Sequence, residues 1–243
     1  MYAIPPYVVG AGIDDPRIRF VWDDTRASED FRFVPYAWMA RIGALSVAAQ
    51  IALGIGLYEW IVWRFHRMDR DPLPMQIAAA AWCASVDPAR VDYIELEREN
   101  WIGPVRGPLW CAVTWMLPMV FEGRDAPGEL ESGAAYLLQL CMHVLPDNSA
   151  FLAWLDAAIG RLEQAVPAVP EDPFEDLFDS AVASGRTEAV DRAVLDPGYR
   201  IDPGLPLPPP ERMLLEPGDG NPLLLTPAQA EARHRRGPFV ADH

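Results

Sequence analysis

Apolar residues recur at helical spacing through most of the chain between about residues 36 and 195. The clearest case is one face formed by Phe151, Leu152, Leu155, Ile159 and Leu162. The same periodicity predicts helices at 36–68, 75–86, 108–121, 132–145, 149–166, 173–184 and 186–195. Pro108 and Ser149 suit the starts of two of them, as a first-turn proline and a cap. We therefore predict a mainly α fold, either a helical bundle or a short α-hairpin repeat.

The two ends of the chain lack this periodicity. Residues 1–35 predict an irregular N-terminal segment, in which Ile18–Trp22 alternates weakly like a short strand. Residues 36–195 form the predicted helical domain. From residue 196 onward, prolines and glycines exclude a long helix or a central strand, yet leucines recur between them. This predicts an extended Pro-rich segment over 196–243 that ends in a short helix, with Thr226 as its cap and Pro227 as its first residue.

A possible internal repeat has a period of 72 residues. At that offset Trp38 aligns with Trp110, and Ala81-Trp82 aligns with Ala153-Trp154. Each half would be a helical hairpin that cannot bury its apolar face alone, so the two halves would pack on each other. The alternative is coincidence in a chain rich in alanine, leucine and tryptophan.

Ile42–Trp63 carries no charge except Glu59 and is long enough to cross a bilayer, which takes about 20 residues. Arginines flank it on both sides, as around a membrane anchor. Gln50, Glu59 and many small residues favour a core helix of a soluble bundle instead. We expect a cytoplasmic protein; the alternative is a single pass through the inner membrane.

Composition narrows the classes of partner. The 243 residues carry a net charge of −15, and all 20 basic residues are arginine, as in GC-rich bacterial genomes. So acidic a protein repels nucleic acid and favours a basic protein partner. Cys83, Cys111 and Cys141 lie in apolar runs and predict buried free thiols. Met1–Gly10 lacks the basic residues of a signal peptide.

No catalytic or cofactor signature stands out. The chain has no Glu-x-x-His step, no Gly-x-Ser-x-Gly elbow and no phosphate-binding loop. His66 suits the end of a helix, and His143 lies in an apolar stretch. We therefore expect no metal, no cofactor and no catalytic nucleophile.

Two stretches are candidate binding elements. In the first, Gly103-Pro104 and Gly107-Pro108 predict a stiff loop that presents Arg106 beside Trp101. The alternative is a structural turn in which Arg106 pairs with Glu97 or Glu99. Glu95, Glu97 and Glu99 would give this element an acidic side. The second is an amphipathic acidic helix whose carboxylates either face solvent or dock a basic partner; its candidate residues are Glu171, Asp172, Glu175 and Asp176.

The charge and the missing catalytic motifs favour a non-enzymatic binding protein. An adaptor or accessory subunit fits, as does an acidic inhibitor, of the antitoxin kind, of a basic partner. One alternative is an enzyme whose Glu59, Glu95, Glu99 and Arg106 meet around a pocket. The other is a membrane-anchored interaction domain.

Overall fold

The computed structural model describes residues 3–9, 11–27, 36–92, 94–168, 189–202, 204–215 and 220–236. Within these ranges the chain is mainly helical and contains no strand; its one β-bridge joins Val91 to Leu224. The longer helices are α2 (Ala37–Gly43), α3 (Val47–Phe65), α4 (Leu73–Val86), α5 (Gly103–Phe121), α6 (Pro127–Val144), α7 (Ser149–Ala165) and α9 (Pro227–Arg236). A mainly α bundle is thus confirmed.

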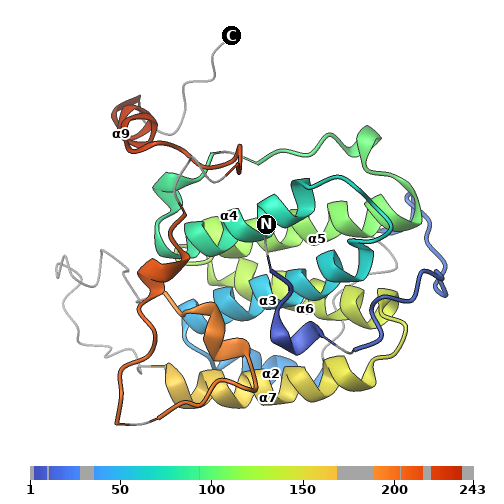
Figure 1. Ribbon diagram of the computed structural model, residues 1–243, viewed down its shortest axis with the longest axis horizontal. Helices are drawn as coiled ribbons and strands as arrows, with labels where there is room; N and C mark the ends of the chain where they lie inside the picture. Colours follow the sequence, from blue (N-terminus) through green and yellow to red (C-terminus); the bar gives the residue numbers. More distant parts are fainter. Residues whose placement is uncertain are drawn as a thin grey trace.

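The bundle has three layers (Figure 1). Helices α4 and α5 form one outer layer, α3 and α6 lie in the middle, and α2 and α7 form the other outer layer. Every residue of α3 from Ala48 to Phe65 is buried. The uncharged stretch is therefore the central helix, and packing against its neighbours covers all its faces. Among the described residues, no helix combines the length and hydropathy that a bilayer crossing requires.

The expected helix at 36–68 is broken in two. The N–H of Ala44 bonds back to Arg41 and Ile42 and closes α2, and the Ser46 hydroxyl then accepts the N–H of Ala49 at 3.3 Å to cap α3. A serine at this position starts a new helix, because its side chain satisfies an amide that the first turn leaves open. The second helix also ends earlier than expected, at Phe65.

Three other helices begin earlier than their apolar pattern indicates, each with a proline in its first turn: Pro74, Pro104 and Pro127. The prediction that Pro108 opens its helix is wrong, because Pro108 lies inside α5. Asp24, from the N-terminal segment, holds the true start of α5. Its carboxylate accepts the Gly103 N–H at 2.8 Å and the Trp22 indole N–H at 2.8 Å.

Other local predictions differ from the structure or lie outside the described residues. Ile18–Trp22 forms no strand. Ser149 is the first residue of α7 rather than its cap, and its N–H bonds to Asp147. The helix expected at 186–195 is reduced, within the described residues, to a 3-10 turn at Arg192–Leu195; the helix expected at 173–184 lies outside the described residues.

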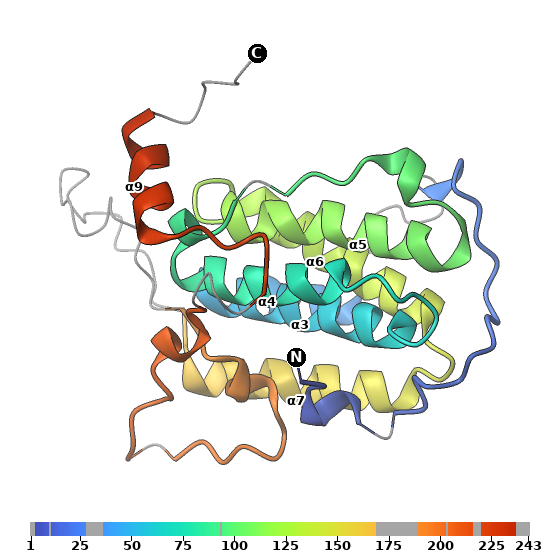
Figure 2. The same ribbon diagram turned by 45° about the horizontal axis from the view of Figure 1, so that its top comes forward.

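The Pro-rich segment follows one end of the bundle and buries Met213 and Leu224 on it (Figure 2). Its final helix, α9, begins as predicted. The Thr226 hydroxyl accepts the Gln229 N–H at 3.2 Å, and the Gln229 side chain accepts the Thr226 N–H at 2.9 Å. This reciprocal pair is a capping box. Helix α9 then projects away from the bundle.

The 72-residue duplication stays a prediction. At that offset α4 corresponds to 145–158, much of which lies in α7. Helix α3, however, corresponds to 119–137, which contains the end of α5 and the start of α6.

Candidate functional site

A surface groove of about 620 Å³ lies between α5 and the preceding segment 88–96. We call it the α5 groove. Its apolar lining is Pro88, Val91, Ile94, Leu96, Trp110, Val113, Leu117, Pro118 and Phe121, and its polar lining is Asp92, Glu95, Thr114 and Glu122. The stretch from Trp110 in α5 to Glu122, the residue that follows the helix, is about 18 Å long at 1.5 Å per residue. The groove therefore has room for a short peptide segment or a few turns of helix.

Both walls of the α5 groove are anchored. On the α5 side, the Trp110 indole donates to the carbonyl of Leu96 at 3.1 Å, and the Arg98 guanidinium stacks 4.4 Å from the Trp110 ring. On the other side, residues 223–225 of the Pro-rich segment pair with residues 90–92. The Asp92 N–H donates to the Leu223 carbonyl at 2.7 Å, and the Leu225 N–H donates to the Arg90 carbonyl at 2.8 Å. The groove is thus formed without a partner present.

The charged residues that line the α5 groove are all acidic. Asp92, Glu95 and Glu122 are exposed at its rim, and no arginine or histidine is among the lining residues. Glu95 is one of the binding residues predicted from the sequence. Such a rim around an apolar floor is complementary to a surface that carries both apolar and cationic side chains.

Pro118 adds a hydrogen-bond acceptor to the α5 groove. A proline inside a helix has no N–H, so the carbonyl four residues earlier loses its helical partner. That carbonyl belongs to Thr114, which is exposed and lines the groove. An Arg or Lys side chain could use this acceptor together with the carboxylates.

The structure places Trp101 and Arg106 differently from the predicted loop. Arg106 lies in the first turns of α5, and Trp101 is buried below its guanidinium at 5.3 Å. The acidic partners of Arg106 are Asp69, at 2.7 and 3.1 Å, and Asp71, at 3.5 Å, rather than Glu97 or Glu99. These aspartates follow α3, and their pairing with Arg106 depends on the packing of α5 beside the end of α3, which no local sequence signal indicates.

This ion pair shifts both pKa values. Burial would raise the pKa of Asp69, but the hydrogen bonds from Arg106 and from backbone amides lower it below its ordinary value. The hydrogen bond to Asp69 in turn raises the pKa of Arg106. Glu97 and Glu99 are exposed, and Glu97 accepts the Asn100 amide at 2.9 Å. The pair therefore fixes the α3–α4 connection to α5.

A second cluster, centred on Glu59, was not predicted as a site in its own right. Glu59 lies within α3 and is fully buried. Its carboxylate accepts hydrogen bonds from the Tyr7 hydroxyl and, at 3.0 Å, from the Trp82 indole, and it forms an ion pair with Arg192 at 2.7 Å. The one sequence signal was a lone acid in an otherwise uncharged stretch, since buried charges need paired partners.

The three partners of Glu59 also line a surface cavity of about 400 Å³, which we call the Glu59 cavity. Its other lining residues are Pro6, Ala79, Asp191, Ala193, Asp196, Arg212, Met213 and Leu215. Tyr7 stacks on Trp154, with ring centroids 5.0 Å apart. The cavity therefore combines aromatic walls from the N-terminal segment and α4 with charged residues from positions 191 to 212.

The residues of the enzyme hypothesis lie in different surroundings. Glu59 is bound to Arg192 in the core, Glu95 lines the α5 groove, and Arg106 is paired with Asp69. Glu99 is exposed, and the contacts of the four side chains do not join them in one pocket. Glu171, Asp172, Glu175 and Asp176 lie outside the described residues.

The three cysteines form no disulfide and are buried, as predicted. Burial raises the pKa of the Cys111 thiol to about 12 and that of Cys141 well above its ordinary value, so neither thiol is suited to act as a nucleophile at neutral pH. Within the described ranges, no three histidine, cysteine or acidic side chains gather closely enough to bind a metal.

No family model matches this sequence, and no similar protein was found among curated proteins or among solved structures.

Proposed function

We propose that this chain is a non-enzymatic binding protein that holds a segment of a basic partner protein in the α5 groove. An adaptor subunit or an inhibitor of a basic protein is the class that fits. The observation that carries the proposal is the lining of the groove, an apolar floor whose charged residues are all carboxylates.

The floor and the rim would have different roles. Apolar side chains of the partner that pack on Leu117 and Phe121 would supply affinity, because a few side chains buried in a water-free pocket dominate the binding energy of an interface. The rim carboxylates and the net charge of −15 attract a cationic partner from a distance and raise the association rate. The carbonyl of Thr114, which Pro118 leaves without its helical partner, favours a donor-rich side chain such as arginine.

The first experiment identifies the partner by its contact. A photo-crosslinking residue at Thr114 is expressed in the source cells and compared with the same residue at Ala157, an exposed position on α7. We expect a protein that crosslinks from Thr114 and not from Ala157, through a peptide that contains both apolar and basic residues. Equal crosslinking from both positions, or an acidic contact peptide, contradicts the proposal.

The second experiment tests the rim with that partner. Glu95→Lys is compared with Glu131→Lys, an equal charge reversal at an exposed position on α6. We expect Glu95→Lys to lower the association rate and weaken its dependence on salt, while Glu131→Lys has a much smaller effect. If the two variants bind alike, the rim is not the site of recognition.

A further inference from the structure

The Glu59 cavity is separate from the α5 groove, and its walls present mainly apolar surface. The Tyr7 hydroxyl and the Trp82 N–H both point to Glu59, which is fully buried behind them. These two side chains therefore offer their rings to the cavity rather than their polar atoms. Met213, Leu215, Ala79 and Pro6 add further apolar surface to the lining.

The charged lining residues lie between 191 and 212 and carry both signs: Asp191 and Asp196 are acidic, Arg212 is basic, and Arg192 is already paired with Glu59. Asp191 accepts the Ala193 N–H at 2.8 Å and Asp196 accepts the Gly198 N–H at 2.8 Å, each through one oxygen. Arg212 is exposed, and its guanidinium makes no hydrogen bond or ion pair with any residue that the structure describes. The cavity is therefore lined by a cationic hydrogen-bond donor, Arg212, and by two anionic acceptors, Asp191 and Asp196.

The presence of both signs of charge in the lining restricts the class of ligand. A simple anion would meet Asp191, Asp196 and the negative field of the whole chain, and a simple cation would meet Arg212. A purely apolar molecule would desolvate these charged groups without replacing their hydrogen bonds. A molecule with both charges on an apolar or aromatic body satisfies all of them. We propose that the Glu59 cavity binds a small zwitterion with an apolar side chain, the chemical class of the free amino acids.

The volume agrees with this class. Small-molecule sites span roughly 300–1,000 Å³, and this cavity of about 400 Å³ is at the small end of that range. Glu59 acts as a positioning residue, because it holds Tyr7, Trp82 and Arg192 in place without lining the cavity itself. This positioning role explains why Glu59 is charged although it lies in the core, where a buried ion pair stabilises a fold less well than apolar packing does.

Three matched probes test the proposal by calorimetry on the full chain. L-phenylalanine carries both charges, phenethylamine lacks the carboxylate, and 3-phenylpropionate lacks the amine. We expect L-phenylalanine to bind at least about tenfold more tightly than either analogue, since each analogue leaves charged groups without partners. Equal binding of the three probes, or no binding of L-phenylalanine at millimolar concentration, overturns the proposal.

Two variants then locate the site. Arg212→Ala removes an exposed guanidinium and is expected to weaken L-phenylalanine about tenfold, while Arg200→Ala, an equal change at an exposed position outside the lining, leaves the affinity unchanged. If both variants bind like the parent, the ligand lies elsewhere and the assignment is wrong. Because these residues do not touch the α5 groove, the result is independent of partner binding.

Discussion

The carboxylate of Glu59 lies 2.7 Å from the guanidinium of Arg192, and the side chain of Glu59 is completely shielded from solvent. This ion pair joins the central helix to the 3-10 turn Arg192–Leu195, which precedes the Pro-rich segment. The Tyr7 hydroxyl shares the same carboxylate, so the N-terminal segment is attached at the same point. One buried acid thus joins both flanking segments to the bundle.

Removing this acid should destabilise the protein strongly. In Glu59→Ala the charge of Arg192 remains without its partner, and Tyr7 and Trp82 lose their acceptor. We expect the free energy of unfolding to fall by about 3–5 kcal/mol, as when one member of a buried ion pair is deleted. Urea denaturation followed by circular dichroism measures it.

The matching control replaces both charges. Glu59→Leu with Arg192→Leu removes the buried pair together, and we expect it to recover part of the loss, because no lone charge is left. A double variant that is less stable than Glu59→Ala would show that the pair itself, rather than the orphaned charge, carries the stability.

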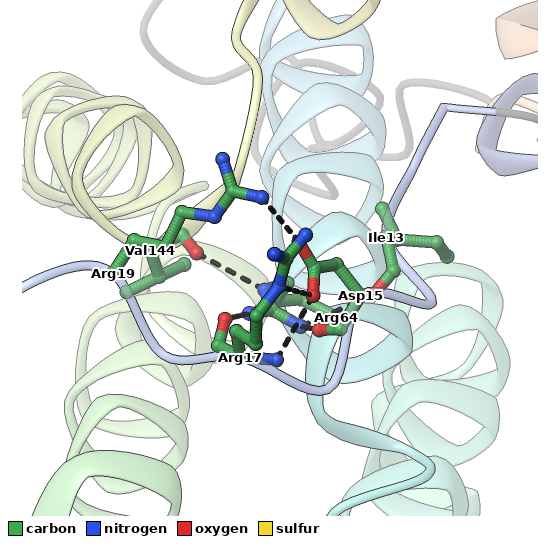
Figure 3. A network of polar contacts seen from close by, with 6 residues as sticks. All are labelled: Ile13, Asp15, Arg17, Arg19, Arg64 and Val144. Carbon is green, nitrogen blue, oxygen red and sulfur yellow. Dashed lines mark hydrogen bonds and ion pairs between the residues drawn. The ribbon is translucent and has the colours of Figure 1, made fainter.

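Arg64 should hold the N-terminal segment in place. It is buried at the end of α3, and its guanidinium donates to the carbonyls of Val144, Ile13, Asp15 and Arg17 at 3.2, 3.1, 2.6 and 2.9 Å (Figure 3). Arg64→Met keeps the apolar stem and loses these bonds. We expect a cost of about 2–4 kcal/mol, and faster tryptic cleavage after Arg17 and Arg19 in the native protein.

Arg67 is the control for that experiment. It follows Arg64 by three residues, is mostly exposed, and pairs with Asp14 at 3.1 Å. Arg67→Met should change stability by less than about 1 kcal/mol and leave the cleavage rate as it is, because surface ion pairs contribute little. Equal effects of the two variants would mean that Arg64 does not anchor the segment.

Two glycines on packed helices should respond differently to alanine. At Gly133, in α6, a Cβ would lie 2.8 Å from the backbone carbonyl oxygen of Trp115 and 2.4 Å from Met119. At Gly54, in α3, it would meet only the flexible end of the Met119 side chain, at 2.6 Å. Since a backbone cannot yield, we expect Gly133→Ala to cost about 1–3 kcal/mol and Gly54→Ala much less, as thermal denaturation would show. A Gly54→Ala that costs as much as Gly133→Ala would contradict this account.

These contacts also show what the sequence could predict. The helices and their apolar faces follow from periodicity, and the cap of α9 follows from Thr226 and Pro227, because those signals are local. The break before α3 was predictable in principle from Ser46. It was missed because the apolar pattern continues across it.

The candidate sites depend on contacts between distant parts of the chain. The sequence predicts Glu95 as a binding residue, but the α5 groove it lines is formed only when segment 88–96 packs on α5. The pairing of Arg106 with Asp69 rather than with a nearby glutamate has the same origin. The spacing of charges along the sequence cannot show which of several acids a helix will bring to an arginine.

The Asp69–Arg106 pair leads to a prediction about acid. The pKa of Asp69 is lower in the folded protein than the ordinary aspartate value of about 3.9 in the unfolded chain. The unfolded state therefore takes up the proton first as the pH falls. The stability that this pair provides is complete above the unfolded pKa and is lost as the pH falls through the folded one.

The neutral variant Asp69→Asn isolates that contribution. We expect it to lower the Tm at pH 7, where the carboxylate is charged and bonded to Arg106 at 2.7 Å, and to approach the Tm of the parent protein as the pH falls below about 4. Asp156→Asn, which removes one exposed partner of Arg41, serves as the control. Its Tm at pH 7 should differ less from that of the parent protein. If the difference in Tm between Asp69→Asn and the parent protein stays constant from pH 7 to pH 3, the carboxylate contributes by packing rather than by its charge.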